Sequence, residues 1–141
     1  MKSGRSATQV ERAKRLLASE GDSGNNADEC ASAAWRVYEK LNVRLVPLLG
    51  SAGVDALFVR SARLEQAEFA SLAEVAAPDG MKRLGACLRT LEPDAATEAA
   101  ASLFGAFLDL ITTFIGERLT AVVLRSAWPE VAEAAPRETK K

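Results

Sequence analysis

The chain has 141 residues, a net formal charge of −1 and no histidine, and 48% of its residues are apolar. This length fits one domain with a real core, and the balanced charges exclude a disordered composition. The lack of histidine excludes histidine bases, histidine-activated nucleophiles and histidine metal ligands. Abundant alanine, with few β-branched and aromatic residues, favours helices over sheet. We therefore expect an all-α single domain of about four to five helices.

Residues 1–27 are predicted to form a basic arm or weak helix followed by a linker, GDSGNN, at 21–26. Ser6 is a suitable cap for a helix ending near Glu20, although its apolar stripe is thin. Residues 1–20 carry a net charge of +3, while residues 90–117 carry −5 with no basic residue. The arm is therefore suited either to nucleic acid or an acidic partner, or to docking on its own acidic helix.

A second helix is expected from the cap Asp28, and Pro47 should end or kink it. Its predicted core face consists of Ala31, Trp35, Tyr38 and Leu41. Arg36, Lys40 and Arg44 form a basic stripe with spacing four on another face. Such a stripe is usually solvated.

The next helix is predicted from Ala52 to Ala70, with Gly50 closing the previous helix and Ser51 as its cap. Residues 71–91 are compatible with a short hairpin or with helical pieces, and we favour a short helix over 81–91. Pro93 then lies in the first turn of the central helix.

The central helix is the longest apolar run, and it extends to Pro129. Two adjacent apolar stripes indicate that it is mostly buried: Leu103, Phe107, Leu110 and Phe114 in one, and Phe104, Leu108, Ile111 and Ile115 in the other. A third stripe has short side chains: Ser102, Ala106, Asp109, Thr113 and Gly116, with Gly105 and Thr112 beside it. A stripe of small residues either lets the backbone of a second helix come close or faces water. We favour a stripe that faces water.

Gly116 offers a kink in this helix. The apolar stretch from Leu103 to Ile115 is shorter than the ~20 residues of a membrane span and is interrupted by Asp109, so no transmembrane segment is predicted. The helical domain should extend over residues 28–133, and the tail over 134–141 should be disordered.

The segments LVPLLGSAGVDALFVRSARL and LITTFIGERLTAVVLRSAWP resemble those of a group of small helical bacterial proteins without an assigned activity. The resemblance spans residues 29–129. It implies that Gly50, Gly53, Arg60 and residues 113–120 matter to that group, and it implies no reaction, cofactor or substrate.

We predict no catalytic, cofactor-binding or metal-ligating residue. Cys30 and Cys87 are far apart in the sequence without a CxxC pattern; we favour two buried thiols, and a disulfide between them stays open. No apolar segment follows the basic N-terminal residues, which predicts no signal peptide and a cytoplasmic location.

Three functions remain open. The favoured one is a non-enzymatic protein-interaction or regulatory module that binds another helix or a second copy of itself. The residues expected to contact a partner are Asp109, Thr113, Glu117 and Arg118, with Arg60 and Arg63 as candidate ion-pair partners of Asp109. The alternative is a nucleic-acid-binding accessory protein that uses the basic arm. The third is a small enzyme, which would require Asp109, Glu117 and an arginine to converge on a pocket.

Overall fold

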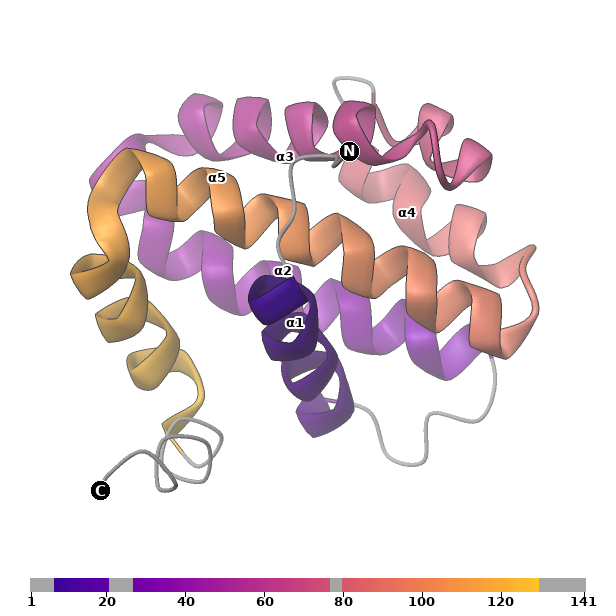
Figure 1. The fold of residues 1–141 in the computed structure, drawn as a ribbon, viewed down its shortest axis with the longest axis horizontal. Coiled ribbons are helices and arrows are strands. Elements are labelled where there is room, and N and C mark those ends of the chain that lie inside the picture. The colour runs from indigo at the N-terminus through magenta and orange to yellow at the C-terminus, as the bar shows by residue number, and fades with distance from the viewer. Residues whose placement is uncertain (1–6, 21–26, 77–79, 130–141) are drawn as a thin grey trace.

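The computed structural model describes residues 7–20, 27–76 and 80–129, and every regular element in them is helical. The elements are α1 (Ala7–Glu20), α2 (Ala27–Leu49), α3 (Ser51–Glu65), the 3-10 helix η1 (Ala70–Glu74), α4 (Gly80–Arg89) and α5 (Pro93–Ala127). Figure 1 shows α5 running the length of the molecule beside α2. The expected all-α fold around a long C-terminal helix is confirmed.

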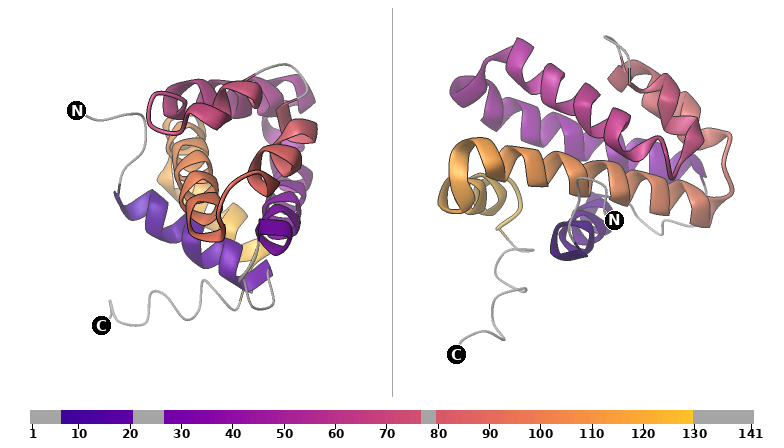
Figure 2. Two further views of the ribbon diagram at one scale, coloured as in Figure 1. Left: turned by 90° about the vertical axis from the view of Figure 1, so that its right-hand side faces the viewer. Right: turned by 45° about the horizontal axis from the view of Figure 1, so that its top comes forward.

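The pair formed by α2 and α5 is covered on two sides. Helix α1 packs against both members of the pair, and α3 packs against both from the other side. Figure 2 shows this arrangement end-on, with α1 crossing below the pair and α3 lying above it. Helix α4 closes the remaining side against α2. Of the predicted arm, weak helix and linker over residues 1–27, residues 1–6 and 21–26 lie outside the described residues, and so does the tail over 134–141.

Four aromatic rings form the centre of the core. Tyr38 of α2, Phe58 of α3, and Phe104 and Phe107 of α5 lie with ring centroids 5.0 to 6.4 Å apart, mostly in edge-on or tilted pairs. These geometries suit the ring quadrupoles and add to the apolar burial. The two predicted stripes of α5 are therefore core as far as Ile111, which is 1% exposed.

Phe114 departs from that prediction, because 65% of its surface is exposed. It lies where α5 reaches the end of the bundle, shortly before the helix bends (Figure 1). Helical periodicity identifies the face of a helix, but it does not show where the neighbouring helices end. The stripe therefore predicts the wrong environment for its last member.

The small-residue stripe of α5 is mostly a contact surface for α1. Ser102, Gly105 and Ala106 are buried. A Cβ on Gly105 would lie 2.9 Å from Cγ2, 3.1 Å from Cα and 3.2 Å from the backbone nitrogen of Val10. The solvated face that we favoured is thus wrong for this part, since only Thr113 and Gly116 at its far end are exposed. Gly105 lets two helix backbones come into contact.

Helix α2 presents the predicted core face with one exception, since Tyr38 also packs against the core. Trp35 is 44% exposed, so its assignment to the core is wrong, whereas Ala31 and Leu41 are buried as expected. The fully buried face is formed by Ala34, Val37, Leu41 and Leu45. Trp35 is predicted in the core because it is large and apolar, but the neighbouring Ala34 occupies the buried position in its place.

Pro47 neither ends nor interrupts α2, which continues to Leu49. Proline removes the backbone donor that would bond the carbonyl of Val43, so α2 lacks one backbone hydrogen bond near its end. The next turn is closed by Gly50, with φ 82° and a hydrogen bond from its N–H to the carbonyl of Val46 (2.7 Å). Gly50 itself precedes α3, which begins at Ser51, so the predicted serine cap is wrong.

Two further boundary predictions differ from the structure. Asp28, the predicted cap of α2, lies inside that helix, which begins at Ala27. Helix α3 ends at Glu65, before the predicted Ala70, and η1 follows it. The undecided region contains α4 rather than a hairpin. Pro93 opens α5 and Trp128 follows its last residue, as expected.

The basic stripe of α2 forms hydrogen bonds and an ion pair with neighbouring helices. Arg36 donates to the carbonyl of Glu20 (2.9 Å), Lys40 forms an ion pair with the Glu20 carboxylate, and Arg44 donates to the hydroxyl of Ser126 (3.0 Å). The expectation of a simply solvated stripe is therefore wrong. The stripe ties α2 to the ends of α1 and α5.

Among the described residues, only α5 is long and apolar enough to cross a membrane by length and composition. The structure buries 61% of its most apolar window against the other helices. Core helices of soluble proteins meet the same criterion. The absence of a transmembrane segment stays a prediction.

The two cysteines are free and buried. Burial raises the pKa of the Cys30 thiol, with a hydrogen bond to Thr97 as a smaller opposing effect. Fewer thiolates are then present at pH 8 than for an ordinary cysteine. We expect the folded protein to react with Ellman's reagent at least about tenfold more slowly than the unfolded chain, which should release two equivalents. Fast reaction of both thiols in the folded protein would contradict this burial.

Candidate functional site

The bend in α5 organises the candidate site. Gly116 has φ 91° and ψ 158°, so residues 93–115 and 117–127 form two helical segments joined at this glycine. Only glycine adopts such a backbone without strain. The kink expected at Gly116 is confirmed, and after it the second segment runs across the direction of the first (Figure 1).

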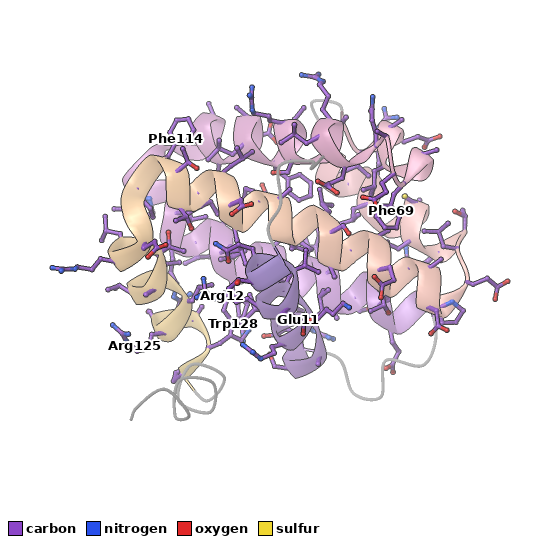
Figure 3. All side chains as sticks on the ribbon, viewed as in Figure 1. Glu11, Arg12, Phe69, Phe114, Arg125 and Trp128 are labelled. Carbon is purple, nitrogen blue, oxygen red and sulfur yellow. The ribbon has the colours of Figure 1, made fainter. Side chains whose placement is uncertain are left out.

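A polar pocket of about 390 Å³ lies where α1 meets the two segments of α5. The first segment contributes Asp109 and Thr112, and the second contributes Glu117 and Thr120. Helix α1 completes the lining with Thr8, Gln9 and Arg12, and Ala121 closes it. Figure 3 shows Arg12 projecting from α1 toward the bent part of α5.

Hydrogen bonds connect the pocket's side chains across the helices. Arg12 donates to the side-chain oxygen of Gln9 (3.1 Å), and the Gln9 amide donates to the hydroxyl of Thr112 (3.3 Å). Burial and the charge of Arg15 lower the pKa of Arg12, while the charge of Glu117 raises it. Arginine keeps its proton under all ordinary conditions, so Arg12 is a fixed positive charge facing the carboxylate of Glu117.

The structure brings together two of the predicted site residues. Asp109 and Glu117 line one pocket although eight positions separate them in the sequence, because the bend redirects the second segment. The arginine that joins them is Arg12, whereas Arg60 and Arg63 lie exposed on α3. The sequence could have indicated Arg12 through charge alone, because it belongs to the basic residues 1–20 and the central helix is acidic over residues 90–117.

Thr113 and Arg118 lie outside this pocket and are exposed on either side of the bend. The Thr113 hydroxyl donates to the carbonyl of Asp109 (3.0 Å), a local bond within the helix. Of the four residues expected to contact a partner, Thr113, Glu117 and Arg118 are thus accessible at the bend.

The pocket meets the geometric condition that we set for an enzyme, but its chemistry favours a structural junction. The hydroxyl of Thr120 donates to the carbonyl of Gly116 (2.9 Å) and that of Thr112 accepts from Gln9. A nucleophile needs a base that takes its proton. Arg12 and Glu117 are opposite charges in this lining, and we draw no catalytic step from this pocket. No group of three metal-ligating side chains occurs in the part of the chain that the structure describes.

Exposed apolar side chains gather at the same end of the molecule. Six large hydrophobic residues are exposed within the described ranges: Trp35, Val43, Leu48, Phe114, Leu119 and Val122. All except Trp35 belong to the bend of α5, its second segment, or the last third of α2. These parts meet at the left-hand end in Figure 1, and Figure 3 places Phe114 at the turn of the ribbon. We call Val43, Leu48, Phe114, Leu119 and Val122 the bent-end surface.

Comparisons with protein families, curated proteins and solved structures find no match to this chain. The resemblance to small helical bacterial proteins stays a prediction.

Proposed function

We propose that the protein is a helical interaction module that self-associates through the bent-end surface. The observation that carries this proposal is the gathering of five of the six exposed large hydrophobic side chains there. Single exposed hydrophobic residues are normal on a soluble protein, but a group of them at one place marks a contact surface. Removing apolar surface from water favours association by about 25 cal/mol per Å² before the entropy lost on association is subtracted.

The charges beside the surface support a second copy as the partner. Glu117 and Arg118 are adjacent, exposed and opposite in charge, and Arg125 is exposed on the same segment. A two-fold interface requires a surface that complements itself. A surface carrying both signs side by side meets that requirement, since the acidic residue of one copy can face the basic residue of the other. A strongly acidic or basic partner fits such a surface less well.

The test is the mass in solution as a function of concentration, measured by size-exclusion chromatography with light scattering. The native protein should approach twice the monomer mass at high concentration. The double substitution Phe114→Gln and Leu119→Gln should weaken dimerisation by about 10- to 100-fold, because it removes two exposed anchors from the interface. Both side chains are exposed, so the thermal unfolding midpoint of the monomer should change little.

A matched control is Trp35→Gln, which removes the exposed hydrophobic residue outside the bent-end surface. This variant should dimerise like the native protein. A native protein that stays monomeric at all concentrations would refute self-association. A dimer that survives the double substitution would place its interface elsewhere.

A further inference from the structure

A second groove lies between α2 and α4, toward the opposite end of the molecule from the bend (Figure 1). It has a volume of about 350 Å³ and is lined by Ala31, Ser32, Trp35 and Arg36 of α2 and by Lys82, Gly85 and Arg89 of α4. Three of these side chains are cationic and none is acidic. The groove thus differs in charge from the pocket at the bend, where two carboxylates face one arginine.

Trp35 gives this groove an aromatic wall. It is 44% exposed, whereas Trp128, the other tryptophan, is 1% exposed. An indole that is neither core nor fully solvated offers a flat apolar face to a ligand. Ser32 lies on the preceding turn of α2 and lines the same groove, which adds a hydroxyl donor and acceptor.

The cationic side chains come from both helices that line the groove. Arg36 donates through Nη1 to the carbonyl of Glu20, and its guanidinium carries five N–H donors in all. On α4, a Cβ at position 85 would lie 3.1 Å from Nη1 of Arg89, so the guanidinium of Arg89 lies over Gly85. The glycine thus leaves room for the arginine along the groove. Lys82 stands one turn before Gly85.

We propose that this groove binds a phosphorylated nucleoside, with the base stacked on Trp35 and the phosphate held by Arg36, Lys82 and Arg89. Aromatic stacking beside a cationic backbone contact is the chemistry by which proteins hold single nucleotides and single-stranded nucleic acids. Arginine and lysine together supply the charge and the donors that phosphate requires. The groove volume lies within the range of small-ligand sites. The phosphorylated nucleoside is either a free nucleotide or a unit of a single strand.

The experiment is titration calorimetry and tryptophan fluorescence with adenosine 5′-monophosphate at low salt. We expect saturable binding and quenching of the Trp35 emission, with inorganic phosphate or adenosine alone binding at least about tenfold more weakly. Raising the salt concentration should weaken the binding, because the phosphate contacts are electrostatic. Absence of binding up to about 5 mM, or phosphate binding as tightly as the nucleotide, would overturn the proposal.

Two variants test the two halves of the site. Trp35→Ala should weaken nucleotide binding by about tenfold while leaving the binding of inorganic phosphate unchanged. Lys82→Gln combined with Arg89→Gln should weaken both ligands. The matched control is Arg60→Gln, which removes an exposed arginine of α3 outside the groove and should have no effect. Unchanged nucleotide affinity in the Trp35 variant would overturn the stacking role.

A single-stranded oligoadenylate of about six nucleotides distinguishes the two sources of the ligand. Binding at least about tenfold tighter than the mononucleotide identifies a strand as the ligand, because further backbone phosphates then add contacts. Equal affinity per site identifies a free nucleotide. The groove is separate from the bent-end surface, so failure here would leave self-association untouched.

Discussion

Replacing Gly105 with alanine is expected to destabilise the protein by about 1–3 kcal/mol, although alanine is the better helix former. The new methyl group would meet the Cα and backbone nitrogen of Val10 at 3.1 and 3.2 Å, and a backbone cannot rotate away as a side chain can. Helix α1 would have to move off α5 as a whole. The gain in helix propensity of about 1 kcal/mol offsets only part of this cost. Chemical denaturation measures the loss.

The control is Gly85→Ala on α4. Its methyl group would meet the end of the flexible Arg89 side chain, which can move aside. This variant should therefore keep or raise the stability, by up to about 1 kcal/mol. Hydrogen exchange gives the local readout, since α1 amides should lose protection in the Gly105 variant and keep it in the Gly85 variant. Equal effects of the two substitutions would show that α1 does not depend on the close approach.

Replacing Glu20 with alanine should lower the stability by about 2–3 kcal/mol, because one carboxylate joins three helical segments. Its oxygen Oε2 accepts a hydrogen bond from the indole of Trp128 (2.8 Å) and pairs with Lys40, and the Glu20 side chain is only 9% exposed. The variant leaves the buried indole N–H of Trp128 without this acceptor. Figure 3 shows Trp128 beside the end of α1. Thermal unfolding at pH 7 measures the effect.

The same carboxylate predicts a dependence on pH. Burial alone would raise the pKa of Glu20, but hydrogen bonds from Lys40 and Trp128, with the charges of Lys40 and Arg36, lower it overall. A pKa that is lower in the folded than in the unfolded state stabilises the fold at neutral pH. That contribution is lost as the pH falls from the ordinary glutamate value, about 4.3, through the lowered one.

Glu20→Gln tests the sign, since the amide oxygen still accepts a hydrogen bond but does not titrate. Its stability should fall less steeply with acid than that of the native protein, so the difference between the two should shrink below about pH 4. A parallel fall of both proteins would show that Glu20 does not carry the acid sensitivity. The ion pair itself adds little to the neutral-pH effect, because Lys40 is 42% exposed.

Much of the fold follows from local patterns in the sequence. Periodicity identified α5 as the core helix, and the residue types at Pro93, Gly116 and Pro129 located its start, its bend and its end. These features are local because proline, glycine and apolar spacing act within a few residues of themselves. The same reasoning failed for Trp35 and Phe114, whose exposure depends on where other helices stop.

The site was harder to predict because its parts come from distant segments. The bend direction at Gly116 decides whether Glu117 faces Asp109, and no pattern in the sequence encodes a direction. Arg12 approaches them only because α1 lies across α5, which in turn depends on the missing side chain of Gly105. A stripe of small residues indicates that another helix can pack closely against it, but the sequence does not identify that helix as α1.

The packing of α1 has a consequence for the order of events during synthesis. Helix α1 is made first, yet its neighbours are α2 and α5, and its last residue binds Trp128 near the far end of the described chain. Domains whose contacts join distant segments pay the entropy of loop closure before those contacts form. On the ribosome α1 therefore has no place to dock on α5 until that helix has emerged. The face of α1 that packs on α5 stays available to chaperones until α5 has been made.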